Sequence, residues 1–156
     1  MVVILSLLKS IYNLIIGNLW FPAHFCGKTI KMEDGLKFKI FRHMRLRKKT
    51  GPDTIVIFIV RFKFKKYSHE TNIKVSRIPI PLIGGFPGFR DKVWMIDRET
   101  GFWQGVYQWD DVQSIEKYKK SVVLAMMNKR AVKDSLSYKT IPGICIEDYL
   151  LSIAVD

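Results

Sequence analysis

The hydrophobic pattern predicts three strands between residues 54 and 109. Residues 54–64 are apolar on both faces from Ile55 to Val60, which is typical of a central strand covered on both sides. Residues 91–97 and 102–109 flank the turn Arg98–Gly101 and predict a β-hairpin. The strand at residues 54–64 should therefore be central in its sheet.

Two helical segments lie between and after these strands. Ser68 can cap a short helix that Pro79 would end, and Asp110 can cap a second helix that should fray by about Lys133. A last strand follows at residues 136–141. From Ile55 onward, the order is the β-α-β-β-α-β order of a ferredoxin-like α+β fold. Both helices would cover one face of the sheet, and a second copy of the chain in a homodimer would cover the other.

A further strand is predicted upstream, at residues 36–46, where apolar side chains alternate with Lys and Arg. The alternation fails at Phe41 and Arg42. This break indicates either a bulge or an arginine directed into the apolar side, and we favour the bulge. Residues 49–53 form a turn that leads into the central strand.

Residues 1–21 are almost entirely apolar, and their exceptions fall on one helical stripe: Ser6, Lys9, Ser10, Asn13 and Gly17. We expect a helix that ends near Pro22. It is long enough for a membrane span, but Lys9 would lie unpaired at mid-depth. The residues that follow do not resemble a signal-peptide cleavage site. The apolar segment 1–25 should instead dock on the protein's own hydrophobic surface or lie on a membrane surface, and both alternatives stay open.

Composition and charge fit a single folded domain over residues 26–156. Hydrophobic residues make up 48% of the chain, which argues against disorder. The net charge of +12 is concentrated in residues 26–66, which carry 13 Lys and Arg against three acidic residues. This basic zone could attract anionic lipid or an acidic ligand, or keep strand edges solvated. Nucleic acid fits least, because the basic residues are not interleaved with a platform of stacking aromatic residues on the same strand, apart from Phe41.

The cysteine content points to a reducing, cytoplasmic compartment. Cys26 and Cys145 are the only cysteines, and they do not form the paired pattern of a disulfide-rich secreted domain. His24 lies near Cys26, but two potential ligands do not make a zinc site. We therefore assign no metal.

The hairpin register predicts a surface rich in aromatic side chains. If Asp97 pairs with Phe102, Trp94 lies opposite Gly105 and Lys92 lies opposite Tyr107. One face then carries four aromatic side chains and two cations: Arg90, Lys92, Trp94, Trp103, Tyr107 and Trp109. Such a face is typical of a pocket for a planar or anionic organic ligand. The alternative is a purely structural core in which Gly105 leaves room for the Trp94 ring.

The hairpin and the segment before it also resemble a known family. The segments Gly85–Phe89, Lys92–Asp97, Glu99–Gly101 and Gly105–Asp110 are similar to those of the YdhR-like monooxygenases. These belong to the dimeric α+β barrel group, which includes antibiotic-biosynthesis monooxygenases. The resemblance covers about residues 55–141. It implies a homodimer whose sheets pack into a barrel, a ligand cavity in each protomer and, in some relatives, oxygen chemistry without a metal or flavin cofactor.

The sequence contains no other persuasive catalytic motif. Neither a Ser/His/Asp or Cys/His constellation nor a phosphate-binding glycine motif is evident. We therefore expect a protein that binds a small organic molecule against the aromatic face, with Lys92 or Arg90 holding an anionic group. It would be either a cofactor-independent monooxygenase for an aromatic or polyketide-like substrate, or a non-catalytic ligand-binding module in peripheral contact with a membrane.

Overall fold

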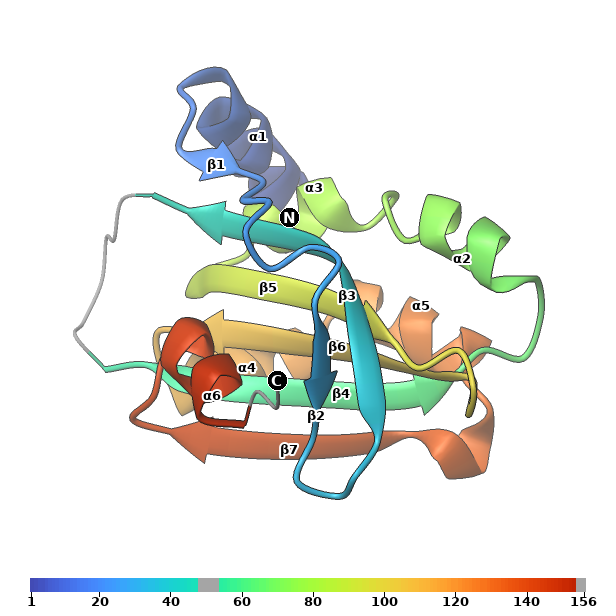
Figure 1. Cartoon of the computed structure of the whole chain (residues 1–156). Helices are drawn as coiled ribbons and strands as arrows, with labels where there is room; N and C mark the ends of the chain where they lie inside the picture. The colour runs from blue at the N-terminus through green and yellow to red at the C-terminus, as the bar shows by residue number, and fades with distance from the viewer. Residues whose placement is uncertain (48–53, 154–156) are drawn as a thin grey trace.

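The computed structural model describes residues 1–47 and 54–153, and one antiparallel sheet forms its centre (Figure 1). The strand order is β1-β3-β5-β6-β4-β7, and β2 pairs with β3. The strands are β1 (Leu19–Trp20), β2 (Thr29–Lys31), β3 (Lys37–Leu46), β4 (Val56–Lys63), β5 (Phe89–Ile96), β6 (Phe102–Trp109) and β7 (Ser137–Pro142). The helices are α1 (Val2–Ile15), α2 (His69–Val75), α3 (Ile80–Gly84), α4 (Val112–Lys119), α5 (Val122–Arg130), the short 3-10 helix η1 (Lys133–Ser135) and α6 (Ile146–Ile153).

The predicted ferredoxin-like α+β order is confirmed from β4 to β7. Strand β4 lies between β6 and β7, and its residues Val56 to Val60 are all at most 5% exposed, as expected of a central strand. The first predicted helix is confirmed as α2, which the Ser68 hydroxyl caps and which ends at Val75, before Pro79. Pro79 then precedes a further short helix, α3. The second predicted helix is a pair of shorter ones, and the Ser121 hydroxyl caps α5. The cap of α4 is Asp111 and not Asp110, because the Asp111 carboxylate accepts the Ser114 N–H at 2.7 Å.

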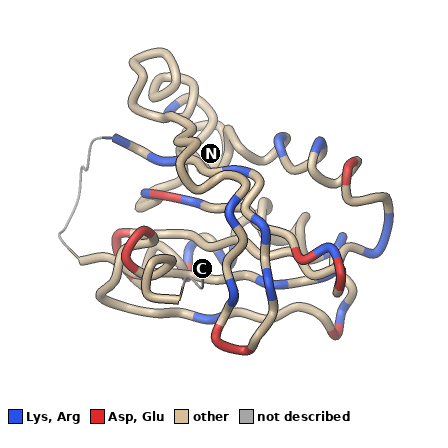
Figure 2. The backbone as a smooth tube through the Cα atoms, in the orientation of Figure 1, with Lys and Arg blue, Asp and Glu red and all other residues tan. Residues whose placement is uncertain are grey.

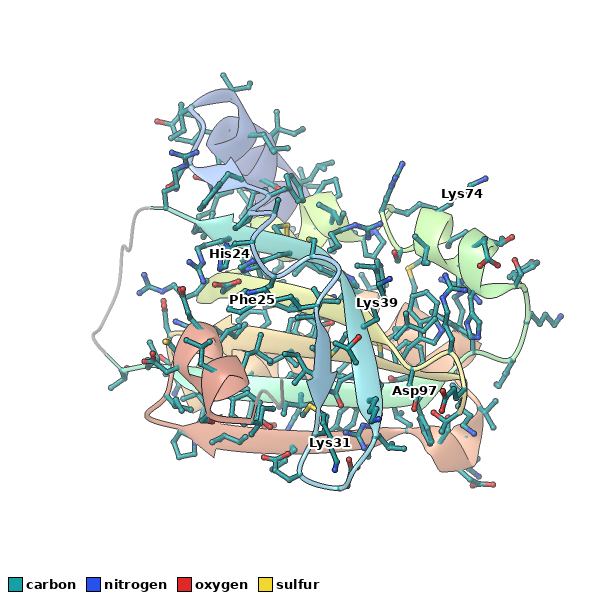
Figure 3. All side chains as sticks on the ribbon, viewed as in Figure 1. His24, Phe25, Lys31, Lys39, Lys74 and Asp97 are labelled. Atoms are coloured by element: carbon teal, nitrogen blue, oxygen red, sulfur yellow. The ribbon has the colours of Figure 1, made fainter. Side chains whose placement is uncertain are left out.

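The sheet face opposite α4 and α5 is covered by the chain itself. Helix α6 and strand β2 lie in front of the sheet in Figure 1, and Figure 3 shows His24 and Phe25 on the same face. They bury an apolar cluster that includes Phe25, Ile30, Ile57, Val93, Met95, Val106, Ile146 and Leu150. A second copy was expected on this face because no segment of the same chain was predicted to cover it. The homodimer therefore stays a prediction that rests on the family resemblance.

The break in alternation in β3 combines both predicted alternatives. The pairing of β3 with β5 shifts between Ile40 and Arg42, which confirms the bulge. Arg42 also turns inward, where its guanidinium donates hydrogen bonds to Ser76 Oγ at 2.8 Å and to the Ile73 carbonyl at 3.1 Å. The bulge thus lets an arginine of the sheet hold the end of α2. The turn predicted at residues 49–53 lies outside the described residues.

Helix α1 is shorter than predicted and is followed by a strand. It ends at Ile15, Gly17 takes a left-handed conformation (φ +69°), and Leu19–Trp20 then pairs with β3. Its buried residues are Ser6, Ser10 and Asn13, which belong to the predicted polar stripe. Among the described residues, no helix is long and apolar enough to cross a membrane.

The basic zone is spread along the sheet rather than gathered into one patch (Figure 2). Arg45 forms ion pairs with Asp91 and Glu147, and Arg61 pairs with Asp34. Lys63 lies 4.5 Å from the centroid of the Phe102 ring. Much of the zone is therefore engaged within the molecule.

Candidate functional site

A cavity of about 210 Å³ lies between the sheet and the helices α2, α3 and α5. Its floor consists of side chains from the central strands, and its wall comes mainly from the segment 75–83 and from α5. Four of the six predicted ligand-binding residues line it, namely Lys92, Trp94, Trp103 and Tyr107. The predicted aromatic face thus borders an apolar cavity.

The hairpin register that places these side chains is confirmed. Lys92 pairs with Tyr107, Trp94 with Gly105 and Ile96 with Trp103. A Cβ atom on Gly105 would lie 2.8 Å from a ring carbon of Tyr107 and 3.5 Å from Cε of Lys92. The glycine therefore makes room for Tyr107 and Lys92, and not for the Trp94 ring as the sequence suggested.

Lys92 is the central polar residue of the cavity. Its Nζ donates a hydrogen bond to the Tyr107 hydroxyl at 2.7 Å, and the Tyr107 and Tyr118 hydroxyl oxygens lie 3.3 Å apart. The same Nζ lies 4.1 Å from the centroids of both the Trp94 and the Tyr107 rings. Lys92 is only 4% exposed, and it forms no ion pair with a carboxylate in residues 1–47 and 54–153. The amine is thus buried among rings and hydroxyl groups.

Burial changes the protonation of this group of side chains. It holds the pKa of Lys92 well below the ordinary value of 10.5, and the positive charge of Arg42 lowers that pKa further. Burial also raises the pKa of the Tyr107 and Tyr118 phenols. The cavity therefore shifts Lys92 toward its neutral form and the two phenols toward their protonated form, which suits a base with hydrogen-bond donors next to it.

Trp94 and Trp103 are fixed by contacts on their far sides. The Trp94 ring lies 5.4 Å from the Arg42 guanidinium. Trp103 donates its indole N–H to His69 Nδ1 at 3.2 Å, and its ring packs edge-on against Phe64 at 5.0 Å. Both rings are at most 5% exposed. They form rigid walls on which a planar ligand can stack.

Arg90 and Trp109 do not line the cavity, which corrects their predicted place in the site. The pairing of β5 with β6 shifts between Phe89 and Asp91, so Arg90 leaves the alternation and forms an ion pair with Asp110. Trp109 is fully buried and packs edge-on against Phe86 and Phe89. Trp109 is thus a core residue, as the alternative interpretation of the face proposed.

The sequence did not indicate Arg130 as a site residue. It lines the cavity from α5, where its guanidinium lies 4.5 Å from the Phe64 ring and donates to Asn72 Oδ1 at 2.7 Å. Ile78 and Met126 also line the cavity and are more than half exposed, which places them at its mouth. Because Arg130 comes from a helix far along the chain, only the folded arrangement brings it to the hairpin.

A second polar cluster lies on the opposite face of the sheet. His43 Nε2 and Asp91 Oδ1 are 2.7 Å apart and buried, and Arg45 Nε donates to the other Asp91 oxygen at 2.6 Å. These residues do not line the cavity. In the described part of the chain, no group of three or more His, Cys, Asp or Glu side chains is placed to hold a metal ion. We interpret the cluster as a structural link between β3 and β5.

Comparison with solved structures supports the fold. An uncharacterized ferredoxin fold protein related to antibiotic biosynthesis monooxygenases, from Listeria monocytogenes, is 12% identical with a TM-score of 0.55, over 87% of this chain and 88% of its own. A monooxygenase-like protein from Listeria innocua is 13% identical with a TM-score of 0.52, over 74% and 68% of the two chains. An anthrone oxidase-like protein is 14% identical with a TM-score of 0.52, and the match covers 70% of this chain but 55% of that protein.

At these identities, the likeness concerns the fold. No protein-family model matches the chain, and no curated protein matches it in sequence. The chain therefore shares the ferredoxin-like fold of the antibiotic-biosynthesis monooxygenase-like proteins, which confirms the fold that the resemblance implied.

Proposed function

We propose that this protein is a cofactor-independent monooxygenase that oxidises a small aromatic or polyketide-like substrate in the cavity. The observation that supports this most is Lys92, an amine buried against the Trp94 and Tyr107 rings, with its pKa lowered and no carboxylate among the described residues to hold it charged. A structural core does not need a lysine at such a position, since burying an unpaired cation is costly. A catalytic base is a function that this environment suits.

The proposed reaction needs only the substrate and molecular oxygen. The Lys92 amine takes a proton from an acidic C–H or phenolic O–H, and the Tyr107 hydroxyl donates a hydrogen bond to the oxyanion that forms. The electron-rich anion passes electrons to oxygen and combines with it as a hydroperoxide, which takes back a proton. Loss of water then leaves a ketone, so a CH₂ group and O₂ become C=O and H₂O.

The size and composition of the cavity support an aromatic substrate. A cavity of about 150 Å³ is enough to bind benzene, so about 210 Å³ fits a somewhat larger ring system. Trp94 and Trp103 supply flat walls, and Arg130 supplies a cation near the mouth for an anionic substituent. The anthrone oxidase-like protein of similar fold makes an anthrone a reasonable first probe.

Oxygen uptake with anthrone tests the proposal. We expect the wild-type protein to consume one O₂ per anthrone oxidised, and Lys92→Met to lose about 100-fold or more of the rate, the usual contribution of a general base. Lys63→Met is the matched control, because Lys63 also lies over an aromatic ring but outside the cavity. An unchanged rate in Lys92→Met would disprove the catalytic role of the amine.

The alternative is a non-catalytic ligand-binding module. It predicts that anthrone quenches the fluorescence of the cavity tryptophans without any oxygen uptake above that of anthrone alone. The same two assays, performed on the same sample, therefore separate binding from catalysis.

A further inference from the structure

Helix α1 is docked in the reverse of the usual orientation. A surface helix of a globular protein normally buries its apolar face and exposes its polar face. In α1, the buried residues are Ser6, Ser10 and Asn13, whereas the opposite face exposes Ile4, Leu8 and Ile15 by 64%, 59% and 78%. The helix therefore presents its hydrophobic side to the surroundings.

The docked side is built for close contact with α3. A Cβ atom on Gly85 would lie 1.7 Å from the Ser6 carbonyl oxygen and 2.8 Å from the Ser10 nitrogen. The Ser6 and Ser10 hydroxyls have no hydrogen-bond partner among the described residues. These serines therefore contribute to the contact through their small side chains, which let the two helices approach closely. Small residues facing one another at this distance are typical of helix pairs in membranes. The inverted orientation is thus fixed by packing.

The exposed apolar surface surrounds α1 on three sides. Leu7, Ile11 and Leu14 lie on one flank, Leu5, Tyr12 and Ile16 lie on the other, and all six are at least 37% exposed. Figure 1 shows α1 and β1 projecting from the edge of the sheet as a ridge. A second copy of the chain would cover one stripe of such a ridge, whereas the acyl region of a lipid leaflet covers all its exposed sides.

The charges around the ridge complement an anionic lipid surface. Residues 1–32 contain no Asp or Glu, and Lys9 lies exposed at the boundary between the docked stripe and the apolar face. At the base of the ridge, the Arg47 guanidinium lies 4.6 Å from the Trp20 ring, a pair suited to the headgroup region. Figure 2 shows no acidic residue on α1, β1 or α3.

We propose that α1 lies in the interface of an anionic membrane, with its Ile4, Leu8 and Ile15 side inserted among the acyl chains and Lys9 and Arg47 at the headgroups. The depth is that of an interfacial helix, about 5–10 Å below the headgroups. The rest of the domain, including the cavity, stays in the aqueous phase. This proposal is independent of the proposed reaction.

Flotation of the full chain with vesicles tests the proposal. The protein is synthesised in a cell-free system with vesicles made of equal parts phosphatidylcholine and phosphatidylserine. We expect the wild-type protein to float, and a triple variant, Ile4→Ser with Leu8→Ser and Ile15→Ser, to lose about tenfold or more of the floated fraction. The matched control is Val112→Ser with Val122→Ser and Leu151→Ser, which also replaces three exposed aliphatic side chains by serine, on other helices, and should float like the wild type.

Two further measurements keep the test decisive. Lys9→Gln should weaken binding to these vesicles about fivefold and leave binding to pure phosphatidylcholine unchanged. Near-ultraviolet circular dichroism should show the same melting for the triple variant as for the wild type, because its three positions are exposed. The proposal is overturned if the wild type does not float. It is also overturned if light scattering without lipid shows that the wild type is an oligomer and that the triple variant is a monomer, because the exposed face would then bind a second copy of the chain.

Discussion

At the scale of single residues, Lys92 should make stability depend on pH. Its folded pKa lies below the ordinary 10.5 of the unfolded chain, so the unfolded state binds more protons between these two values, and stability rises with pH across that window. Lys92→Met removes this effect. We expect Lys92→Met to have the higher free energy of unfolding at pH 7. Within the window, its advantage over the wild type should shrink by about 1.4 kcal/mol for each unit by which the pH rises.

Urea unfolding between pH 7 and pH 9 measures this difference. The range stays below the region where Tyr107 and Tyr118, whose folded pKa values are raised, would lose stability as the pH increases. Lys63→Met is again the control for replacing a lysine that lies over an aromatic ring. A pH-independent difference for Lys92→Met would mean that the buried amine keeps its ordinary protonation.

Two tryptophans of the hairpin should separate binding from packing. Trp94 lines the cavity, whereas Trp109 is buried outside it. Replacing either by Ala should lower the free energy of unfolding by about 3–5 kcal/mol, as large-to-small core substitutions do. We expect only Trp94→Ala to weaken ligand affinity as well, measured by fluorescence quenching with the remaining tryptophans. Equal affinities in the two variants would place the ligand elsewhere.

At the scale of elements, the contact between α1 and α3 should depend on Gly85. Gly85→Ala places a methyl group on the Ser6 backbone, which cannot move aside without displacing the helix. We expect α1 to detach, which limited proteolysis would detect as faster cleavage near residue 17. Ser6→Ala is the control, because it keeps the small size and removes a hydroxyl that has no partner in the described structure. Equal cleavage of all three proteins would show that α1 is not held by this contact.

Local patterns predicted the elements better than they predicted the surroundings of each element. The hairpin register followed from one turn, because pairing in a hairpin is fixed by residues adjacent in sequence. The polar stripe of α1 was also evident, but a stripe does not say which of its sides is buried. Arg90 was misplaced because the bulge after Phe89 interrupts the alternation without a distinct sequence signal.

Long-range contacts could not be predicted in the same way. Arg130 reaches the cavity from α5, and His43 of β3 contacts Asp91 of the neighbouring strand β5. Neither contact joins residues close in sequence, so no local pattern predicts it. The cover of the second sheet face by α6 was missed for the same reason. The apolar tail indicated packing, but not the surface on which it packs.

At the scale of the whole molecule, α6 should control self-association. Together with β2, it covers an apolar cluster that includes Ile57, Val93, Met95 and Val106, on the face through which the resemblance implies that two sheets pack. We therefore propose that a family-type homodimer requires α6 to be displaced, and that a chain ending at residue 143 self-associates more strongly than the full chain. Light scattering at micromolar concentration measures both. A truncated chain that stays folded and monomeric would argue against an interface on this face.

The protonation of Lys92 in the presence of an aromatic ligand tests the account most directly, because both the catalytic role and the binding site depend on it. Lysine labelled with ¹³C at Cε allows the Lys92 pKa to be read by NMR, with Lys92→Met identifying its signal. We expect a Lys92 pKa below 10.5 in the free protein and a shift of the Lys92 signal when anthrone is added. A Lys92 signal that titrates at 10.5 or above and does not respond to anthrone would contradict it.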